Sequence, residues 1–196
     1  MSQHETQLIR MTPRFRQLQV VHTERLTPNM QRIVVGGDAL EGFDSRSPDD
    51  HVKLFFANAE GEFVLPELTE QGPRYPEDKQ PSPARDYTPR FYDADAGELV
   101  LDFVLHGDGP ATLWAANAKV GDELVVAGPR GSHVVADDFD CYVLIGDETA
   151  LPAIARRLEE LPEGAVAEVF IEIPEEGDRQ PLESAAQVTV SWFERN

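Results

Sequence analysis

The sequence predicts an antiparallel β-barrel followed by a partial α/β layer. Short runs rich in Val, Ile, Phe and Leu, separated by Gly-containing turns, fill residues 14–135, as in an antiparallel sandwich or barrel. After about residue 136, a strand pattern, a helix pattern and two more strand patterns follow one another, as in parallel βαβ units. We therefore expect two domains, of residues 1–136 and 137–196.

The barrel strands are expected in five apolar segments. They cover residues 15–26, 30–37, 50–63, 84–107 and 122–131. Within the fourth segment, a turn at Ala96 and Gly97 predicts a hairpin that brings the strand ending at His106 beside the strand that begins at Arg85. Residues 66–83 hold five prolines among polar residues and are expected to form a long loop.

The α/β layer is expected to begin with the apolar run at residues 141–146. Residues 151–161 place apolar side chains at helical spacing, and residues 165–173 and 188–193 have the pattern of two further strands. The single cysteine, Cys141, opens the first run, so we expect an inert thiol in the core.

Composition excludes several classes of function. The chain has 17 Lys and Arg against 36 Asp and Glu, a net charge of −19, and no basic run, so a nucleic-acid partner is not expected. One Cys and five His without i, i+4 pairing give no reason to expect a metal site. The sequence shows neither a signal-peptide core nor an apolar run of membrane-spanning length, so we expect a cytoplasmic protein without membrane contact.

Three segments have the chemistry to hold an anion, and the first is GDGPAT at residues 107–112. Gly109 is expected to allow a tight turn, and Pro110 suits the first helical position, which leaves the first-turn amides free as donors. A dinucleotide fingerprint is not indicated, because Thr112 stands where a third Gly is needed and the helix is short. Two interpretations stay open, a pyrophosphate cradle and a plain strand-to-helix turn.

The second segment is RDYTPR at residues 85–90. Strand alternation directs Arg85 and Tyr87 to one face and Thr88 to the other, which offers a guanidinium for phosphate, a ring for stacking and a hydroxyl. One face of the neighbouring strand carries Asp102, Val104 and His106. The alternative is that these are ordinary surface side chains that cover the sheet.

The third segment is GDETALP at residues 146–152, between an apolar strand and a helix. This is the geometry of a nucleotide phosphate site in an α/β layer. Asp147 and Glu148 favour the helix dipole just as an anionic ligand does, so helix capping is the competing interpretation.

Taken in order, these segments resemble the siderophore-interacting protein family, FAD-binding relatives of ferredoxin reductase. The matching text is LTPNMQRIVVGGDALEGF, PDDHVKLFF, the block from RDYTPRFYD to GPRGS, and YVLIGDETALPAIARRLEELP, which together run over most of residues 18–162. The resemblance implies a ferredoxin-reductase-like, FAD-binding antiparallel Greek-key β-barrel followed by a partial Rossmann-like α/β nucleotide-binding domain.

The resemblance also implies site residues. In this family the R-x-Y-T motif holds a non-covalent flavin, so Arg85 is expected at the FAD phosphates, Tyr87 on the isoalloxazine and Thr88 near its N5 edge. The remaining FAD contacts are assigned to Asp102, Val104, His106, Gly109, Ala111 and Thr112. Contacts to NAD(P)H are assigned to Gly146, Asp147, Glu148, Thr149 and Pro152.

The activity implied by the resemblance is reduction of ferric siderophores. NAD(P)H passes a hydride to FAD, and single electrons then reduce the Fe(III) of the siderophore and release Fe(II), so no catalytic residue beyond the flavin is expected. Lys53, Arg90 and Arg130 are candidates for holding the anionic chelate.

The C-terminus departs from the family pattern. Family members continue beyond the third strand of the nucleotide domain, whereas this sequence stops at Asn196, so we expect a truncation that retains the FAD barrel. The alternatives are a flavin- or siderophore-binding module without turnover, and a reductase that serves a redox protein or a quinone.

Overall fold

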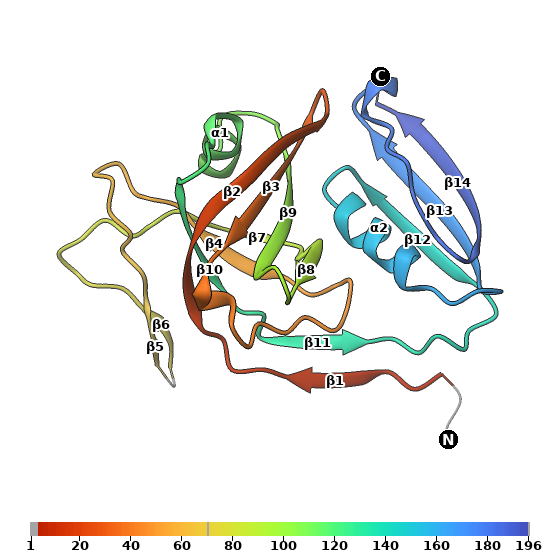
Figure 1. The fold of residues 1–196 in the computed structure, drawn as a ribbon, viewed down its shortest axis with the longest axis horizontal. Helices are drawn as coiled ribbons and strands as arrows, with labels where there is room; N and C mark the ends of the chain where they lie inside the picture. The colour runs from red at the N-terminus through yellow and green to blue at the C-terminus, as the bar shows by residue number, and fades with distance from the viewer. Residues whose placement is uncertain (1–3, 70, 196) are drawn as a thin grey trace.

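The computed structural model describes residues 4–69 and 71–195. Figure 1 shows two layers side by side, a curled antiparallel sheet and a smaller parallel sheet that carries one helix. The strands follow one another in the order that the sequence predicted. Pairing changes from antiparallel to parallel between residues 134 and 142.

The curled sheet has seven strands in the order β7-β4-β10-β2-β3-β9-β8, and every neighbouring pair is antiparallel. The strands are β2 (Phe15–Thr27), β3 (Met30–Gly36), β4 (Val52–Phe55), β7 (Ala84–Tyr87), β8 (Phe91–Asp93), β9 (Glu98–Val104) and β10 (Glu123–Ala127). Alternate residues of these strands, among them Leu18, Val20, Leu99 and Leu101, fill the interior of the curl.

The prediction of one continuous strand from Arg85 to Tyr92 was wrong, because this segment forms two separate strands. β7 ends at Tyr87 and β8 begins at Phe91, and Pro89 between them lacks the N–H that a continuous ladder needs. β7 pairs with β4 and β8 pairs with β9, so this segment crosses between the two edges of the sheet and closes the curl. The hairpin predicted at Ala96 and Gly97 is confirmed, but it joins β8 to β9. β7 lies outside it and meets β9 across the curl, where the Tyr87 ring packs on Phe103.

Smaller elements surround the barrel. β1 (Gln7–Arg10) pairs with β11 (Gly131–Val134), and the 3₁₀ turn η1 (Asp38–Leu40) and helix α1 (Pro110–Asn117) lie against the barrel strands. The predicted proline-rich loop contains a short hairpin, β5 (Glu67–Thr69) with β6 (Gly72–Arg74). This hairpin projects from the side opposite the α/β layer (Figure 1). Pro73 lies opposite Leu68 in it, and a short two-stranded hairpin tolerates a proline that a central strand does not.

The α/β layer consists of β12 (Tyr142–Asp147), α2 (Leu151–Glu160), β13 (Val166–Ile173), the 3₁₀ turn η2 (Glu176–Asp178) and β14 (Gln187–Glu194). The three strands are parallel in the order β12-β13-β14. The apolar stripe of α2, with Ile154 and Leu158, packs on Val169 and Ile171 of the sheet. Cys141 lies just before β12 and is exposed, so the prediction of a core thiol was wrong.

The two layers share contacts that hold them together. Met30 and Val104 belong to the barrel strands but are buried in the core of the α/β layer. The buried carboxylate of Asp178, from the loop after β13, accepts hydrogen bonds from Thr27 Oγ1 at 2.7 Å and from the Asn29 amide at 3.0 Å. Both an apolar and a polar contact therefore fix the barrel against the α/β layer.

Candidate functional site

A cavity of about 420 Å³, here called the central pocket, opens between the two layers. Its lining includes all nine residues that the family resemblance assigned to FAD binding: Arg85, Tyr87, Thr88, Asp102, Val104, His106, Gly109, Ala111 and Thr112. The turn before α2 adds Thr149 to the same wall, and the first turn of α2 adds Pro152 and Ala153. Three segments far apart in the sequence thus converge on one cavity.

The pocket wall formed by β7 carries the Tyr87 ring and the Arg85 guanidinium. The Tyr87 ring packs on Phe103 with ring centroids 4.4 Å apart, and burial raises the pKa of the Tyr87 hydroxyl to about 12. Arg85 is exposed and donates to the Ala84 carbonyl at 2.8 Å. Thr88 lines the same pocket rather than the opposite face, because β7 ends at Tyr87 and strand alternation does not extend to it.

The wall from α1 is made of backbone. The tight turn is at Gly107, with φ of +61°, and not at Gly109, whose φ of −67° any residue can adopt. A Cβ added to Gly109 would meet no atom within 4 Å, so glycine leaves open space in the pocket here. The first amides of α1 have no partner within the helix, while the Thr112 hydroxyl donates to the His106 carbonyl at 3.0 Å.

The floor of the pocket holds a buried ion pair. Asp102, 4% exposed, accepts from Arg32 Nε at 2.7 Å and from Arg32 Nη2 at 2.8 Å, and Arg90 Nε lies 4.0 Å away. The bond to Asp102 raises the pKa of Arg32 above its usual value. Both carboxylate oxygens of Asp102 are therefore bonded to the protein, which suits a supporting role beneath the pocket.

The third predicted segment divides between the pocket and the protein interior. Thr149 and Pro152 line the central pocket, whereas Gly146, Asp147 and Glu148 do not. A Cβ on Gly146 would lie 2.5 Å from the Ala150 Cβ, so this glycine allows α2 to pack closely on β12.

The two acids of this segment are occupied by protein contacts. Asp147 Oδ1 accepts from the Thr149 amide at 2.9 Å and from the Thr149 hydroxyl at 2.5 Å, and the hydroxyl bond lowers the pKa of Asp147 most. The buried Glu148 pairs with Arg195 after β14. Asp147 thus stabilises the turn that precedes α2, but no side chain caps the helix itself.

Sequence reasoning assigned no role to the residues between β3 and β4 that line the pocket: Asp49, Asp50 and His51. They belong to the PDDHVKLFF motif, whose consecutive polar residues before an apolar strand were the available signal. Asp50 is 3% exposed, and its Oδ2 accepts from Ser45 Oγ at 2.9 Å and Ser132 Oγ at 2.6 Å. The loop before β4 is therefore fixed by a buried carboxylate.

A second cavity of about 380 Å³, here called the lateral pocket, shares His51 and Asp86 with the central pocket. Its lining combines cations with apolar and aromatic side chains: Arg14, Lys53, Arg130, Phe15, Phe55, Leu68 and Tyr75. Of the three predicted chelate candidates, two lie here. Arg90 does not, because its guanidinium pairs with Glu159 on α2 and its side chain is only 12% exposed.

Within residues 4–69 and 71–195, no group of three or more His, Cys, Asp or Glu side chains is arranged to hold a metal ion. In that part of the chain, neither α1 nor α2 has the length and apolar character of a membrane span.

Comparison with known proteins identifies the family. The family model described as siderophore-interacting FAD-binding domain matches residues 19–133, and the one described as siderophore-interacting protein matches residues 139–196. The chain belongs to the siderophore-interacting protein family. The two matches meet near the point where antiparallel pairing gives way to parallel pairing.

Named relatives agree with this family. The chain is 49% identical over 160 residues to the NADPH-dependent ferric-chelate reductase of Escherichia coli, covering 82% of this chain and 62% of that protein. It is 35% identical over 189 residues to the ferric vibriobactin reductase ViuB of Vibrio cholerae, covering 95% of this chain and 68% of that protein. The chain thus spans about three fifths to two thirds of the length of these relatives.

Solved structures give the same result for the fold. A siderophore utilization protein from T. fusca superposes with a TM-score of 0.88 at 42% identity, covering 98% of this chain and 73% of that one. A ferredoxin-NADP⁺ reductase from Plasmodium falciparum superposes with a TM-score of 0.59 at 12% identity, covering 95% of this chain and 78% of that one. The siderophore-interacting chain therefore has a ferredoxin-reductase-like fold with a curled antiparallel half-barrel.

Proposed function

We propose that this chain forms part of an FAD-dependent NAD(P)H oxidoreductase that reduces ferric siderophores. The observation that carries the proposal is the adjacency of two unlike pockets. The central pocket joins the barrel to the first turn of α2, and the lateral pocket, lined by cations and aromatic rings, shares the wall formed by His51 and Asp86. A cofactor in the first pocket and an anionic chelate in the second would be separated by one layer of side chains.

The residues of the central pocket fit FAD. The open space at Gly109 admits a phosphate close to the backbone, where the first-turn amides of α1 are donors. Arg85 supplies a cation for the same phosphates, and the half-buried ring of Tyr87 offers a flat apolar surface for the isoalloxazine. Tyr87 stays neutral at physiological pH, so its hydroxyl remains a hydrogen-bond donor.

The α/β layer is proposed to be the nicotinamide side, as part of a Rossmann-like domain of residues 137–196, with residues 1–136 as the flavin domain. In open parallel sheets ligands bind beyond the carboxyl ends of the strands, which is where Thr149 and Pro152 face the central pocket. Gly146 and Asp147 support this wall from behind through packing and the turn before α2.

The lateral pocket is proposed to receive the ferric chelate. A bound flavin would supply the change from two-electron to one-electron transfer. The protein's part is to attract and orient the chelate: Lys53 and Arg130 provide local positive charge on a chain of net charge −19. Lys53 Nζ lies 2.6 Å from Asp86 Oδ1, so an anionic chelate competes with this carboxylate for the ammonium.

Anaerobic addition of NADH or NADPH to the FAD-loaded chain tests the proposal. Bleaching of the visible flavin absorbance, followed by its return on adding a ferric siderophore, is the expected result. FAD binding without bleaching would support a flavin- or siderophore-binding module instead. Bleaching that is reversed by a redox protein or a quinone, but not by ferric siderophore, would show a reductase of another acceptor.

A further inference from the structure

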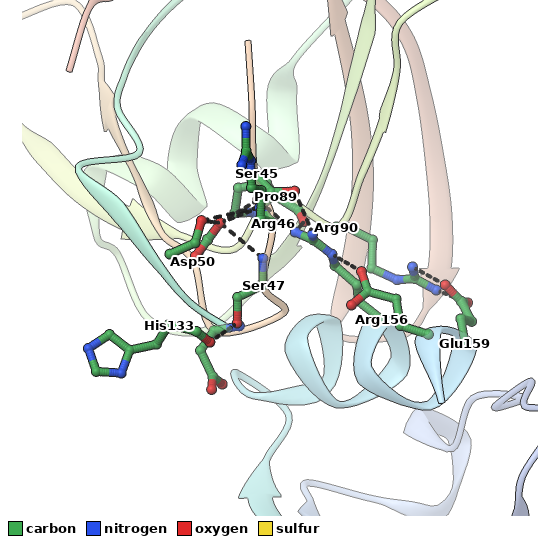
Figure 2. Close-up of polar contacts among 12 residues, drawn as sticks. Ser45, Arg46, Ser47, Asp50, Pro89, Arg90, His133, Arg156 and Glu159 are labelled. Atoms are coloured by element: carbon green, nitrogen blue, oxygen red, sulfur yellow. Dashed lines mark hydrogen bonds and ion pairs between the residues drawn. The ribbon is translucent and has the colours of Figure 1, made fainter. Parts of the chain in front are cut away.

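Arg156 on α2 connects the α/β layer to the barrel through three acceptors. Its Nη1 donates to Ser45 Oγ at 2.8 Å and to the Pro89 carbonyl at 3.0 Å, and its Nη2 donates to the Ser45 carbonyl at 2.9 Å. Nε bonds Glu160 at 2.7 Å, and the side chain is 11% exposed. Figure 2 shows this side chain reaching from the helix to the loop that holds Ser45 and to Pro89.

Both acceptor segments continue directly into walls of the central pocket. Pro89 follows Thr88, which lines the pocket. The Ser45 hydroxyl that accepts from Arg156 donates in turn to Asp50 Oδ2, and the same oxygen accepts from the Arg46 amide at 2.9 Å. Asp50 also lines the pocket, so two walls on the barrel side are bonded, directly or through one hydroxyl, to one guanidinium.

The helix that carries Arg156 also forms the opposite wall. Pro152 and Ala153, one turn earlier on α2, line the central pocket. Arg156 itself does not line the pocket. Next to it, Glu159 of the same helix pairs with Arg90, which adds a second contact between α2 and the barrel (Figure 2).

We propose that Arg156 is a positioning residue that sets the separation between the nicotinamide-side wall on α2 and the flavin-side walls at Thr88 and Asp50. This inference rests on the proposed function of the central pocket. Hydride transfer requires the two reacting rings in contact geometry, and a displacement of about 1 Å is enough to slow such a step about 100-fold. A planar guanidinium with several fixed donors suits three acceptors at once, whereas a lysine ammonium on a flexible stem does not hold them in one geometry.

The test compares substitutions of Arg156 with a matched control on the next residue. Arg156→Gln and Arg156→Lys remove the fork that holds Ser45 and Pro89. Arg157→Gln is the control, because Arg157 is also half-buried on α2. Its guanidinium bonds the Ala136 carbonyl at 3.4 Å and lies over the Tyr142 ring, and it makes no hydrogen bond to Ser45 or Pro89. Stopped-flow measurements with NADPH give the limiting rate of flavin reduction and the half-saturating concentration separately.

We expect Arg156→Gln to lower the limiting rate of flavin reduction about 10- to 100-fold. Arg156→Lys should recover part of the loss, while the FAD dissociation constant and the reoxidation by ferric siderophore stay unchanged. Equal slowing in Arg157→Gln, or a wild-type rate in Arg156→Gln, would overturn the inference, because the effect would then be general destabilisation or none.

Hydrogen exchange supplies a readout that does not depend on nicotinamide. In Arg156→Gln, the amides of Arg46 and Ser47, which bond Asp50, should exchange faster, whereas in Arg157→Gln they should not. Unchanged exchange in Arg156→Gln would refute the positioning role even if wild-type protein accepts no hydride. Failure of the wild type to be reduced would instead contradict the proposed function alone.

Discussion

Replacing Gly109 by valine tests whether this glycine is needed for the fold or for leaving space for a bound ligand. The backbone at Gly109 has φ of −67° and ψ of 153°, a conformation that valine adopts readily, and an added Cβ meets no protein atom within 4 Å. Valine is a poorer N-cap residue than glycine, so the folded chain without cofactor should lose no more than about 1 kcal/mol of stability. The added side chain fills space in the central pocket that the proposal gives to the FAD phosphates.

The expected loss of affinity follows from the contacts that valine would block. A hydrogen bond to a charged group contributes about 1.5–3 kcal/mol. Displacing one amide–phosphate bond from the α1 terminus should therefore weaken FAD binding about 10- to 150-fold. Larger displacement of the phosphates would remove further bonds and weaken binding more.

The assay is titration of FAD into each variant, followed by flavin fluorescence, together with urea unfolding of the cofactor-free chain. Gly97→Ala is the control, because Gly97 has φ of +63°, lies outside the pocket and has open space around it. It should lose about 1 kcal/mol of stability and keep its FAD affinity. Unchanged FAD binding in Gly109→Val would show that the phosphates lie elsewhere.

Two further predictions concern charge. Asp86→Asn frees Lys53 and should raise kcat/KM for an anionic ferric chelate about two- to fivefold. Glu62→Gln frees the exposed Lys79 in the same way, but neither residue lines the lateral pocket, so kcat/KM should stay unchanged. Equal effects of the two variants would contradict the lateral site. Burial raises the pKa of Tyr87 to about 12, so the folded state keeps a proton that the unfolded chain loses above about pH 10. The free energy of unfolding should therefore fall as pH rises from 10 to 12. Urea unfolding of Tyr87→Phe should show a fall smaller than that of the wild type by about 2–3 kcal/mol. The same fall in both proteins would contradict this role of Tyr87.

The sequence predicted strand positions well where apolar runs were long, as in β2, β3, β9 and β13. It missed the break at Pro89, because one proline does not show whether a strand continues beside the same partner or crosses to another edge. The β5–β6 hairpin was missed for a related reason, since proline excludes a central strand but not a short exposed one.

The motifs identified residues that line one pocket, but they did not predict how these residues are arranged. All nine barrel residues converge on one pocket, yet the tight turn is at Gly107 rather than Gly109, since both glycines satisfy the same sequence pattern. The Arg32–Asp102 pair joins residues 70 apart in the sequence, and the Arg156–Ser45 bond of the network to Asp50 joins residues 111 apart. Such contacts follow from tertiary packing, which one sequence does not specify locally.

The most direct test of ferric reduction bypasses the nicotinamide. The FAD-loaded chain is reduced chemically under anaerobic conditions and mixed with a ferric tris-catecholate in the presence of a ferrous-iron indicator. The adjacency of the central and lateral pockets predicts return of the flavin absorbance together with one Fe(II) for each electron released. A flavin that stays reduced, with no ferrous iron formed, would contradict the assignment of the chain to ferric siderophore reduction.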